Sequence, residues 1–182
     1  MKKTIFTILL AGLAVLAFSQ EYDTSLKKDI FSVDIGFFGA WVNYERHLDG
    51  LFTLNTELGL DGGFGVDFMH GEYVAFAPTI RVEPRYYYSF NRRVRLGKKT
   101  SYNASSYIAF TSLYLSNLFT ISNVSGLEAA TGLYLIPKWG IKRTIGQRLN
   151  FEFALGIGAG PFFGKDKIEA TAGIDLRFGY NF

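Results

Sequence analysis

The stretch from Glu169 to Phe182, EATAGIDLRFGYNF, decides the fold class of this chain. Its residues alternate between an apolar set and a charged, polar or glycine set. The apolar set is Ala170, Ala172, Ile174, Leu176, Phe178, Tyr180 and Phe182, and the other is Thr171, Gly173, Asp175, Arg177, Gly179 and Asn181. A period of two, with one face suited to lipid and the other to a polar interior, is typical of a strand in a transmembrane β-barrel. The sequence therefore predicts a barrel strand over this stretch.

The rest of the chain contains seven further alternating segments, separated by turn residues. They cover residues 29–37, 40–48, 51–61, 76–90, 104–116, 128–141 and 149–159. Asp49-Gly50 lies between two of them and is a strong two-residue hairpin signal. No linker or repeat divides the chain. The sequence therefore predicts an all-β fold, an eight-stranded antiparallel up-and-down transmembrane β-barrel over residues 29–182, as one domain.

The N-terminus predicts export. Lys2 and Lys3 precede an apolar run over residues 5–18, and Ala17-Phe18-Ser19 offers small residues at the spacing that a signal peptidase reads. The run is shorter than the roughly 20 residues that a spanning helix needs. We therefore expect a cleavable signal peptide over residues 1–19 and a short periplasmic segment over 20–28. Without the signal peptide the formal charge falls from +3 to +1, so the pI near 9.0 does not indicate a nucleic-acid partner.

The inward-facing set of residues is strongly charged. It contains Glu45, Glu57, Arg81, Glu83, Arg85, Glu152, Asp175 and Arg177, and Lys138 and Lys142 are further cations of the same set. An eight-stranded barrel has room inside for little more than its own side chains, and a lone buried charge is costly. We therefore expect a packed structural ion network, with paired catalytic carboxylates or a proton path as the alternative. Pro84 and Pro137 lie inside predicted strands, so we expect a bulge or a projecting strand section at each.

Aromatic residues cluster where alternate strands end. These residues are Tyr44, Tyr86, Tyr88, Phe90, Trp139, Phe178, Tyr180 and Phe182. Aromatic girdles mark the membrane interfaces of barrels, and an even strand number places both termini on one side, which is usually periplasmic. The clustering therefore predicts that these strand ends lie at the periplasmic interface.

Several short motifs resemble those of small outer-membrane β-barrel proteins of the Bacteroidota type, akin in architecture to the OmpA membrane domain. They are Tyr44-Glu45-Arg46 with its Asp-Gly turn, Glu83-Pro84-Arg85-Tyr86-Tyr87-Tyr88 followed by Gly97-Lys98-Lys99-Thr100, a turn at Gly140-Ile141-Lys142-Arg143, and the terminal Phe182. The resemblance implies residence in a Gram-negative outer membrane, with lipid and lipopolysaccharide around the barrel. It also implies insertion by the outer-membrane assembly machinery, for which Phe178, Tyr180 and Phe182 would be the signal. It carries over no catalytic residue.

The segments that join the predicted strands hold the remaining functional candidates. Residues 91–103 contain Arg92, Arg93, Arg95, Lys98 and Lys99 and no acid, which suits either anionic headgroups or a periplasmic partner. The opposite loops, 62–75, 117–127 and 160–169, contain Phe64, Phe68, Phe119, Phe162 and Phe163. Binding residues concentrate on loops that a rigid scaffold holds, so these phenylalanines are candidate contacts for an envelope protein. The alternative is that they fold over the barrel as a lid.

An enzyme is the main competing class, because some barrels of this size modify lipid A with a serine, a histidine and an acid. The candidates would be His70 with Asp67 or Glu72, and Ser122 or Ser125. No motif surrounds them, and His47 suits a hydrogen-bonded structural role instead. Cysteine is absent and no cluster has metal-ligand spacing, so we assign no catalytic residue, metal or cofactor. We expect a non-enzymatic structural or interaction component of the envelope, with a narrow pore as a further alternative.

Overall fold

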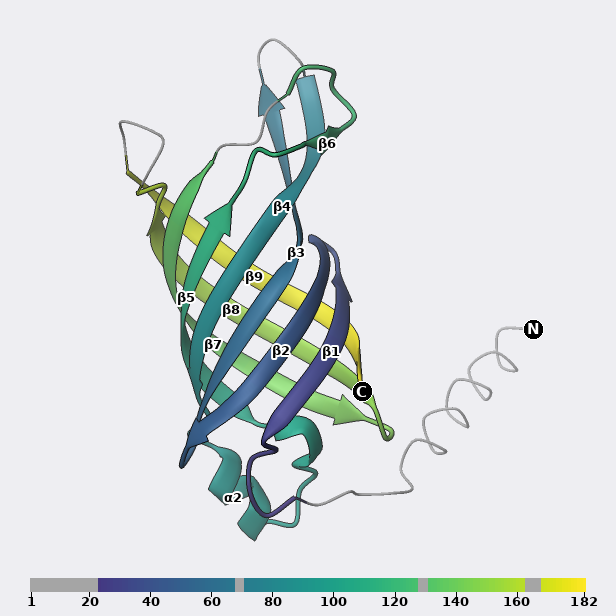
Figure 1. Ribbon diagram of the computed structural model, residues 1–182, viewed down its shortest axis with the longest axis vertical. Helices are drawn as coiled ribbons and strands as arrows, with labels where there is room; N and C mark the ends of the chain where they lie inside the picture. The colour runs from purple at the N-terminus through teal and green to yellow at the C-terminus, as the bar shows by residue number, and fades with distance from the viewer. Residues whose placement is uncertain (1–22, 68–70, 128–130, 163–167) are drawn as a thin grey trace, which may run out of the picture.

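The structure is a computed structural model that describes residues 23–67, 71–127, 131–162 and 168–182, and about two thirds of these residues are in strands (Figure 1). The strands are β1 (Asp29–Gly36), β2 (Gly39–Asp49), β3 (Phe52–Asp67), β4 (Gly71–Tyr86), β5 (Ser106–Leu115), β6 (Ile121–Ser122), β7 (Gly132–Ile145), β8 (Leu149–Gly160) and β9 (Glu169–Asn181). A short helix, α2 (Phe90–Arg95), and a 3₁₀ turn, η1 (Ser101–Asn103), lie between β4 and β5. The predicted signal peptide 1–19 lies outside the described residues, as do Phe68, His70 and Phe163.

The strands close into a ring. Each pairs antiparallel with its neighbours in the order β1-β2-β3-β4-β5-β7-β8-β9, and β9 pairs back onto β1. At this seam the Phe182 N–H donates to the Phe31 carbonyl at 2.9 Å. The two-residue β6 is an addition that pairs with β4 beyond the end of β5. The predicted all-β, eight-stranded, up-and-down ring is therefore confirmed.

The two ends of the barrel differ (Figure 1). At one end, which we call the helix end, lie α2 and η1. The residues before β1 and the C-terminal end of β9 lie at the same end. At the other, the loop end, the β3–β4 hairpin rises above its neighbours. The predicted loop over residues 62–75 is wrong, because β3 continues to Asp67 and β4 begins at Gly71. A Cβ on Gly62 would be 2.5 Å from the ring of Phe76 on the paired strand. The ring covers the glycine, and the strand pairing continues through this position.

Two other predicted boundaries are wrong. The fourth strand ends at Tyr86, and Phe90 begins α2 and is 1% exposed instead of joining an outer girdle. It packs with Leu26 and two inward tyrosines, so burial of the ring turns the chain under the barrel. The predicted strand over residues 128–141 corresponds to β7, which begins at Gly132 and continues to Ile145. Residues 140–143 are therefore strand, and the turn falls at Gly146, whose φ of +61° favours glycine.

Neither proline forms the bulge or the projecting strand section that we expected. Pro84 pairs with Leu54 of β3, but the β4–β5 ladder lacks pairs between Val82 and Arg85 and resumes in the same register. Pro137 likewise pairs with β5, while the β7–β8 ladder is interrupted from Leu135 to Lys138 without a shift. The missing proline N–H is therefore accommodated by a local gap in one ladder.

The barrel is polar inside and apolar outside. Among the described residues, 24 polar or charged side chains are buried against 11 hydrophobic ones. The outer face of the strands is almost wholly apolar, and its charged residues lie near the two ends, at Asp29, Arg46, Arg143 and Glu72. A soluble protein of this size would bury its apolar residues instead.

Candidate functional site

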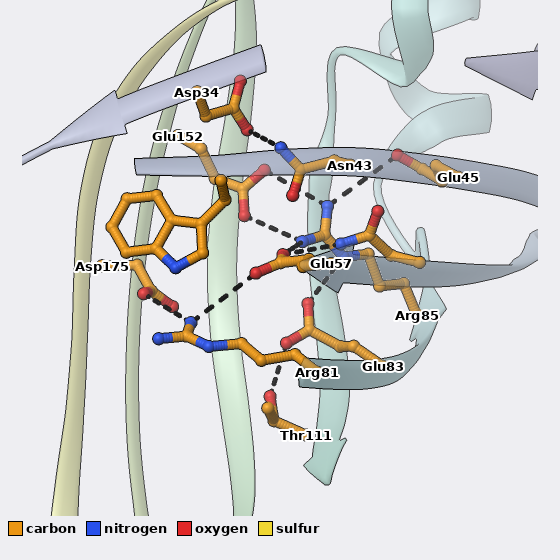
Figure 2. A network of polar contacts seen from close by, with 12 residues as sticks. Asp34, Asn43, Glu45, Glu57, Arg81, Glu83, Arg85, Thr111, Glu152 and Asp175 are labelled. Atoms are coloured by element: carbon orange, nitrogen blue, oxygen red, sulfur yellow. Dashed lines mark hydrogen bonds and ion pairs between the residues drawn. The ribbon is translucent and has the colours of Figure 1, made fainter. Parts of the chain in front are cut away.

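A connected set of ion pairs fills the middle of the lumen (Figure 2). It includes all eight charged residues of the predicted network, which come from five strands: Glu45 on β2, Glu57 on β3, Arg81, Glu83 and Arg85 on β4, Glu152 on β8, and Asp175 and Arg177 on β9. Each is at most 9% exposed. Their side chains meet because each occupies an inward position of its strand.

Arg85 is the centre of this network. Its Nε donates to Glu83 Oε1 at 2.6 Å, and its two terminal nitrogens donate to the two oxygens of Glu152 at 2.9 and 3.2 Å. The Tyr107 hydroxyl donates to the same Glu152 carboxylate at 2.7 Å, and the Arg85 guanidinium lies 4.6 Å from the centre of that tyrosine ring. Two-pronged arginine–carboxylate pairs of this kind are among the strongest polar contacts in proteins.

Longer ion pairs join Arg85 to the neighbouring carboxylates. Arg85 lies 3.6 Å from Glu57 and 3.8 Å from Glu45. Glu45 has closer partners, because Lys142 Nζ donates to it at 2.8 Å and the Asn103 amide at 2.9 Å. Asn103 belongs to η1, so the network also holds the turn that lies beneath the barrel.

The loop-end side of the network is built around Arg177 and Arg81. Arg177 donates to Glu57 Oε2 at 2.9 Å and to Asp175 Oδ1 at 2.7 Å. Arg81 donates to the same Asp175 oxygen at 3.0 Å and to both oxygens of Asp61 at 2.6 and 3.2 Å. Each of these five groups thus contacts a group of opposite charge.

Lys138 links the two sides of the network. Its Nζ lies 2.8 Å from Asp175 Oδ2 and 2.5 Å from Glu83 Oε2, and the Thr111 hydroxyl also donates to Glu83. The described network therefore holds five cations and six carboxylates, which is close to neutral.

Several members were missed from the sequence. Trp41, 3% exposed, donates from its indole nitrogen to Asp61 at 2.9 Å, and the Arg177 guanidinium stacks on its ring at 4.0 Å. Trp41, Asp61 and Tyr107 all have inward parity, which was the signal that could have found them. The indole lies over glycines of neighbouring strands: a Cβ on Gly59 would be 2.5 Å from it.

Asp34 lies apart from the cations. The Asn43 amide donates to its Oδ2 at 2.7 Å and the Asn150 amide to its Oδ1 at 3.1 Å, and Asn150 also donates to Asn181. This amide cluster spans β1, β2, β8 and β9, so it ties together the strands at the seam.

The helix end of the lumen is closed by apolar packing. Phe90 of α2 packs with Leu26, Tyr87 and Tyr107. The segment before β1 pairs with the chain around η1, because the Lys27 N–H donates to Asn103 Oδ1 at 2.8 Å. Apolar side chains therefore close the lumen at the helix end, beneath the charged middle.

The basic residues of the segment over residues 91–103 form a patch at the same end of the barrel. Arg92 and Arg95 are exposed, and half-buried Arg93 donates to the Lys99 carbonyl at 2.7 Å. Burial lowers the pKa of Arg93, but an arginine starts so far above neutral pH that it stays charged. The patch is therefore cationic at physiological pH.

The other candidates lie on the outer face and the loop end. Phe178, Tyr180 and Phe182 are 40–58% exposed along the outer face of β9. Tyr44 of β2 and Trp139 of β7 are similarly exposed on the outer faces of their strands, as is Tyr88 in the turn after β4. Phe64, Phe119 and Phe162 are exposed at the loop end, where Phe64 stacks on Phe38.

The residues of the enzyme alternative do not form a described triad. The Ser122 hydroxyl accepts from the Val124 N–H at 3.1 Å, and His70 lies outside the described residues. His47 Nε2 contacts the Gly50 carbonyl at 3.0 Å in the β2–β3 turn, which is a structural contact. Among the described residues, no cluster of three or more histidine, cysteine or acidic side chains suits a metal ion, and no helix is long and apolar enough to cross a membrane.

Comparison with known proteins adds no relative, since no protein-family model, curated protein or solved structure matches this chain.

Proposed function

We propose that the chain is a bacterial outer-membrane β-barrel that serves as a structural or interaction component of the envelope. The observation that carries the proposal is the reversal of polarity in a closed ring: buried charges inside, and an outer face that is apolar between its two ends. Closed rings satisfy every strand edge, which is the requirement for a β-protein in lipid. An apolar outer band of this kind is the common property of transmembrane barrels.

The filled middle of the lumen supports a structural role over that of a porin. The charged side chains of six strands pair across it, and opening a water-filled path would require separating these buried pairs. The same pairing uses the carboxylates as hydrogen-bond acceptors for fixed partners. This arrangement favours rigidity over catalysis.

The loop end supports the interaction part of the proposal. Leu118 is 83% exposed, and Phe119 and Ile121 nearby are also exposed, next to the projecting β3–β4 hairpin. Exposed apolar groups on a part of the molecule that would face water mark contact surfaces. The partner would be another envelope protein.

The membrane proposal can be tested with phospholipids brominated on their acyl chains, because bromine quenches a tryptophan that faces lipid. The chain has two tryptophans, Trp139 on the outer face at 40% exposure and Trp41 in the lumen at 3%. In brominated vesicles the unmodified protein should lose much of its fluorescence, while the Trp139→Phe variant should lose little. Equal quenching of both proteins, or folding of the protein in buffer without lipid or detergent, would refute the proposal.

A further inference from the structure

A cavity of about 660 Å³ occupies the loop-end half of the lumen, above the ion network. Its walls are mainly apolar side chains on inward positions of three strands: Ala75 and Ala77 of β4, Leu113 and Leu115 of β5, and Tyr134 and Ile136 of β7. Ligand pockets have volumes of about 300–1,000 Å³ and mostly apolar walls. The cavity therefore has the size and lining of a site for a small organic molecule.

The hollow is bordered by inward residues with small side chains or none. They are Gly63 of β3, Ala75 and Ala77 of β4, and Gly173 of β9, and a Cβ on Gly63 would meet nothing within 4 Å. An eight-stranded barrel is normally just filled by its side chains, so small residues at these inward positions leave space. The expected filled interior is thus found in the middle of the barrel but not at its loop end.

The floor of the cavity is polar, yet its charges are already paired. Arg81, Lys138, Asp61 and Asp175 line it together with Trp41. Arg81 pairs with both acids, and Lys138 pairs with Asp175. A carboxylate ligand would meet the two acids, and an ammonium ligand would meet the two bases. Such like-charge contacts disfavour either ion.

An uncharged acceptor does not have this difficulty. A guanidinium has five N–H donors, and the three hydrogen bonds that Arg81 makes to Asp61 and Asp175 leave donors for a carbonyl or hydroxyl oxygen. The ligand oxygen would then lie beside the Trp41 indole, which forms part of the same floor.

We propose that this cavity binds an uncharged amphiphile, an apolar chain or ring system that ends in an ester, amide or hydroxyl group. The polar end lies on the floor at Arg81, and the apolar body lies along the walls formed by Ala77, Leu113 and Ile136. The bound molecule replaces water in contact with apolar walls, which is the main source of its affinity.

The Trp139→Phe variant tests the proposal, because Trp41 is then the only tryptophan and reports from the cavity floor. The protein is folded into vesicles of ordinary phospholipid and titrated with the methyl ester of α-bromodecanoic acid, whose bromine lies next to the polar end. The free acid at pH 8 is the matched charged probe. Saturable quenching by the ester is expected, with an apparent affinity at least about tenfold higher than that of the acid.

Two variants in the Trp139→Phe background separate the cavity from the bilayer. Ala77→Phe fills the cavity and should abolish the saturable quenching, whereas Ala40→Phe adds the same ring to the exposed face of β2 and should leave it unchanged. If Ala77→Phe does not fold, Ala75→Phe blocks the cavity one inward position nearer the rim.

Quenching that rises linearly with the ester in the lipid, to the same extent in the filled variant, would overturn the proposal. Acid binding as tight as ester binding would overturn the assignment of an uncharged ligand. Brominated phospholipid reports on the outer face through Trp139 and the ester reports on the lumen through Trp41, so the membrane proposal and the cavity proposal can fail separately.

Discussion

Replacing Arg85 by alanine should destabilise the barrel more than any replacement of an exposed arginine. Four carboxylates lie within 3.8 Å of the Arg85 guanidinium. Three of them keep a cation: Glu83 keeps Lys138 at 2.5 Å, and Glu45 and Glu57 keep partners at 2.8 and 2.9 Å. Among the described residues, Glu152 keeps the neutral Tyr107 hydroxyl as a hydrogen-bond donor but no close cation. The variant therefore leaves one buried carboxylate without a close cation.

Breaking a buried ion pair by removing one partner costs about 3–5 kcal/mol. With a urea dependence of about 2 kcal/mol per M, the unfolding midpoint should fall by roughly 1.5–2.5 M. The measurement is equilibrium unfolding in phospholipid vesicles, followed by tryptophan fluorescence and by the mobility of the unheated protein in gel electrophoresis. Arg46→Ala, on the exposed face of β2, is the matched control and should change the free energy of unfolding by about 0.5 kcal/mol or less.

A second substitution tests the cause. Adding Glu152→Gln to Arg85→Ala removes the orphaned charge while keeping an oxygen that can accept from Tyr107, so part of the lost stability should return. If Arg85→Ala behaves like Arg46→Ala, or if the double variant is no more stable than Arg85→Ala alone, the reasoning about the network is wrong.

Four further predictions follow from other parts of the barrel. Deleting Phe182, which closes the seam, should lower the amount of folded protein in the outer membrane, and an unchanged amount in fractionated cells would contradict the assembly role. Replacing Phe119 and Phe162 by serine should leave the barrel folded and weaken any partner that co-purifies in mild detergent; failure to fold would favour the lid interpretation. In planar bilayers the unmodified protein should show no stable porin-sized conductance, and steady nanosiemens openings would refute the filled lumen. Gly140→Ala, whose Cβ would lie 2.3 Å from an inward tyrosine ring, should lose about 1–3 kcal/mol by thermal or urea unfolding, while Gly63→Ala, with open space around its Cβ, should lose less than 1 kcal/mol.

Alternation along the chain predicted the ring and the facing of most side chains, because the period of two is a property of each strand alone. Glu57 and Arg177 face inward for this reason, although they are 120 positions apart. Which charges pair depends on how the strands are staggered, and that was beyond the pattern. Trp41 was missed because an inward aromatic residue carries no sign of the glycine at 59 that makes room for it.

The errors have a common physical origin in long-range packing. Gly62 and Gly63 indicated a loop, yet cross-strand contact with Phe76 extends the sheet through Gly62. Phe90 continued the alternation, yet it lies beneath the barrel because its ring packs against Leu26 and two inward tyrosines. The cavity depends on small residues of β3, β4 and β9 bordering the same space, and no local window of sequence contains that arrangement.

The two proline gaps divide the barrel wall unequally. The β5–β7 ladder is continuous over ten paired positions, while its flanks lack pairs beside Pro84 on one side and Pro137 on the other. β5 and β7 are thus paired continuously with each other, while each lacks some backbone pairs with its other neighbour, β4 or β8; these two junctions are the borders of the β5–β7 pair. Local opening requires least free energy where backbone hydrogen bonds are fewest. Thermal opening of the barrel wall will therefore be concentrated along these two borders and along the β1–β9 seam, which has five paired positions.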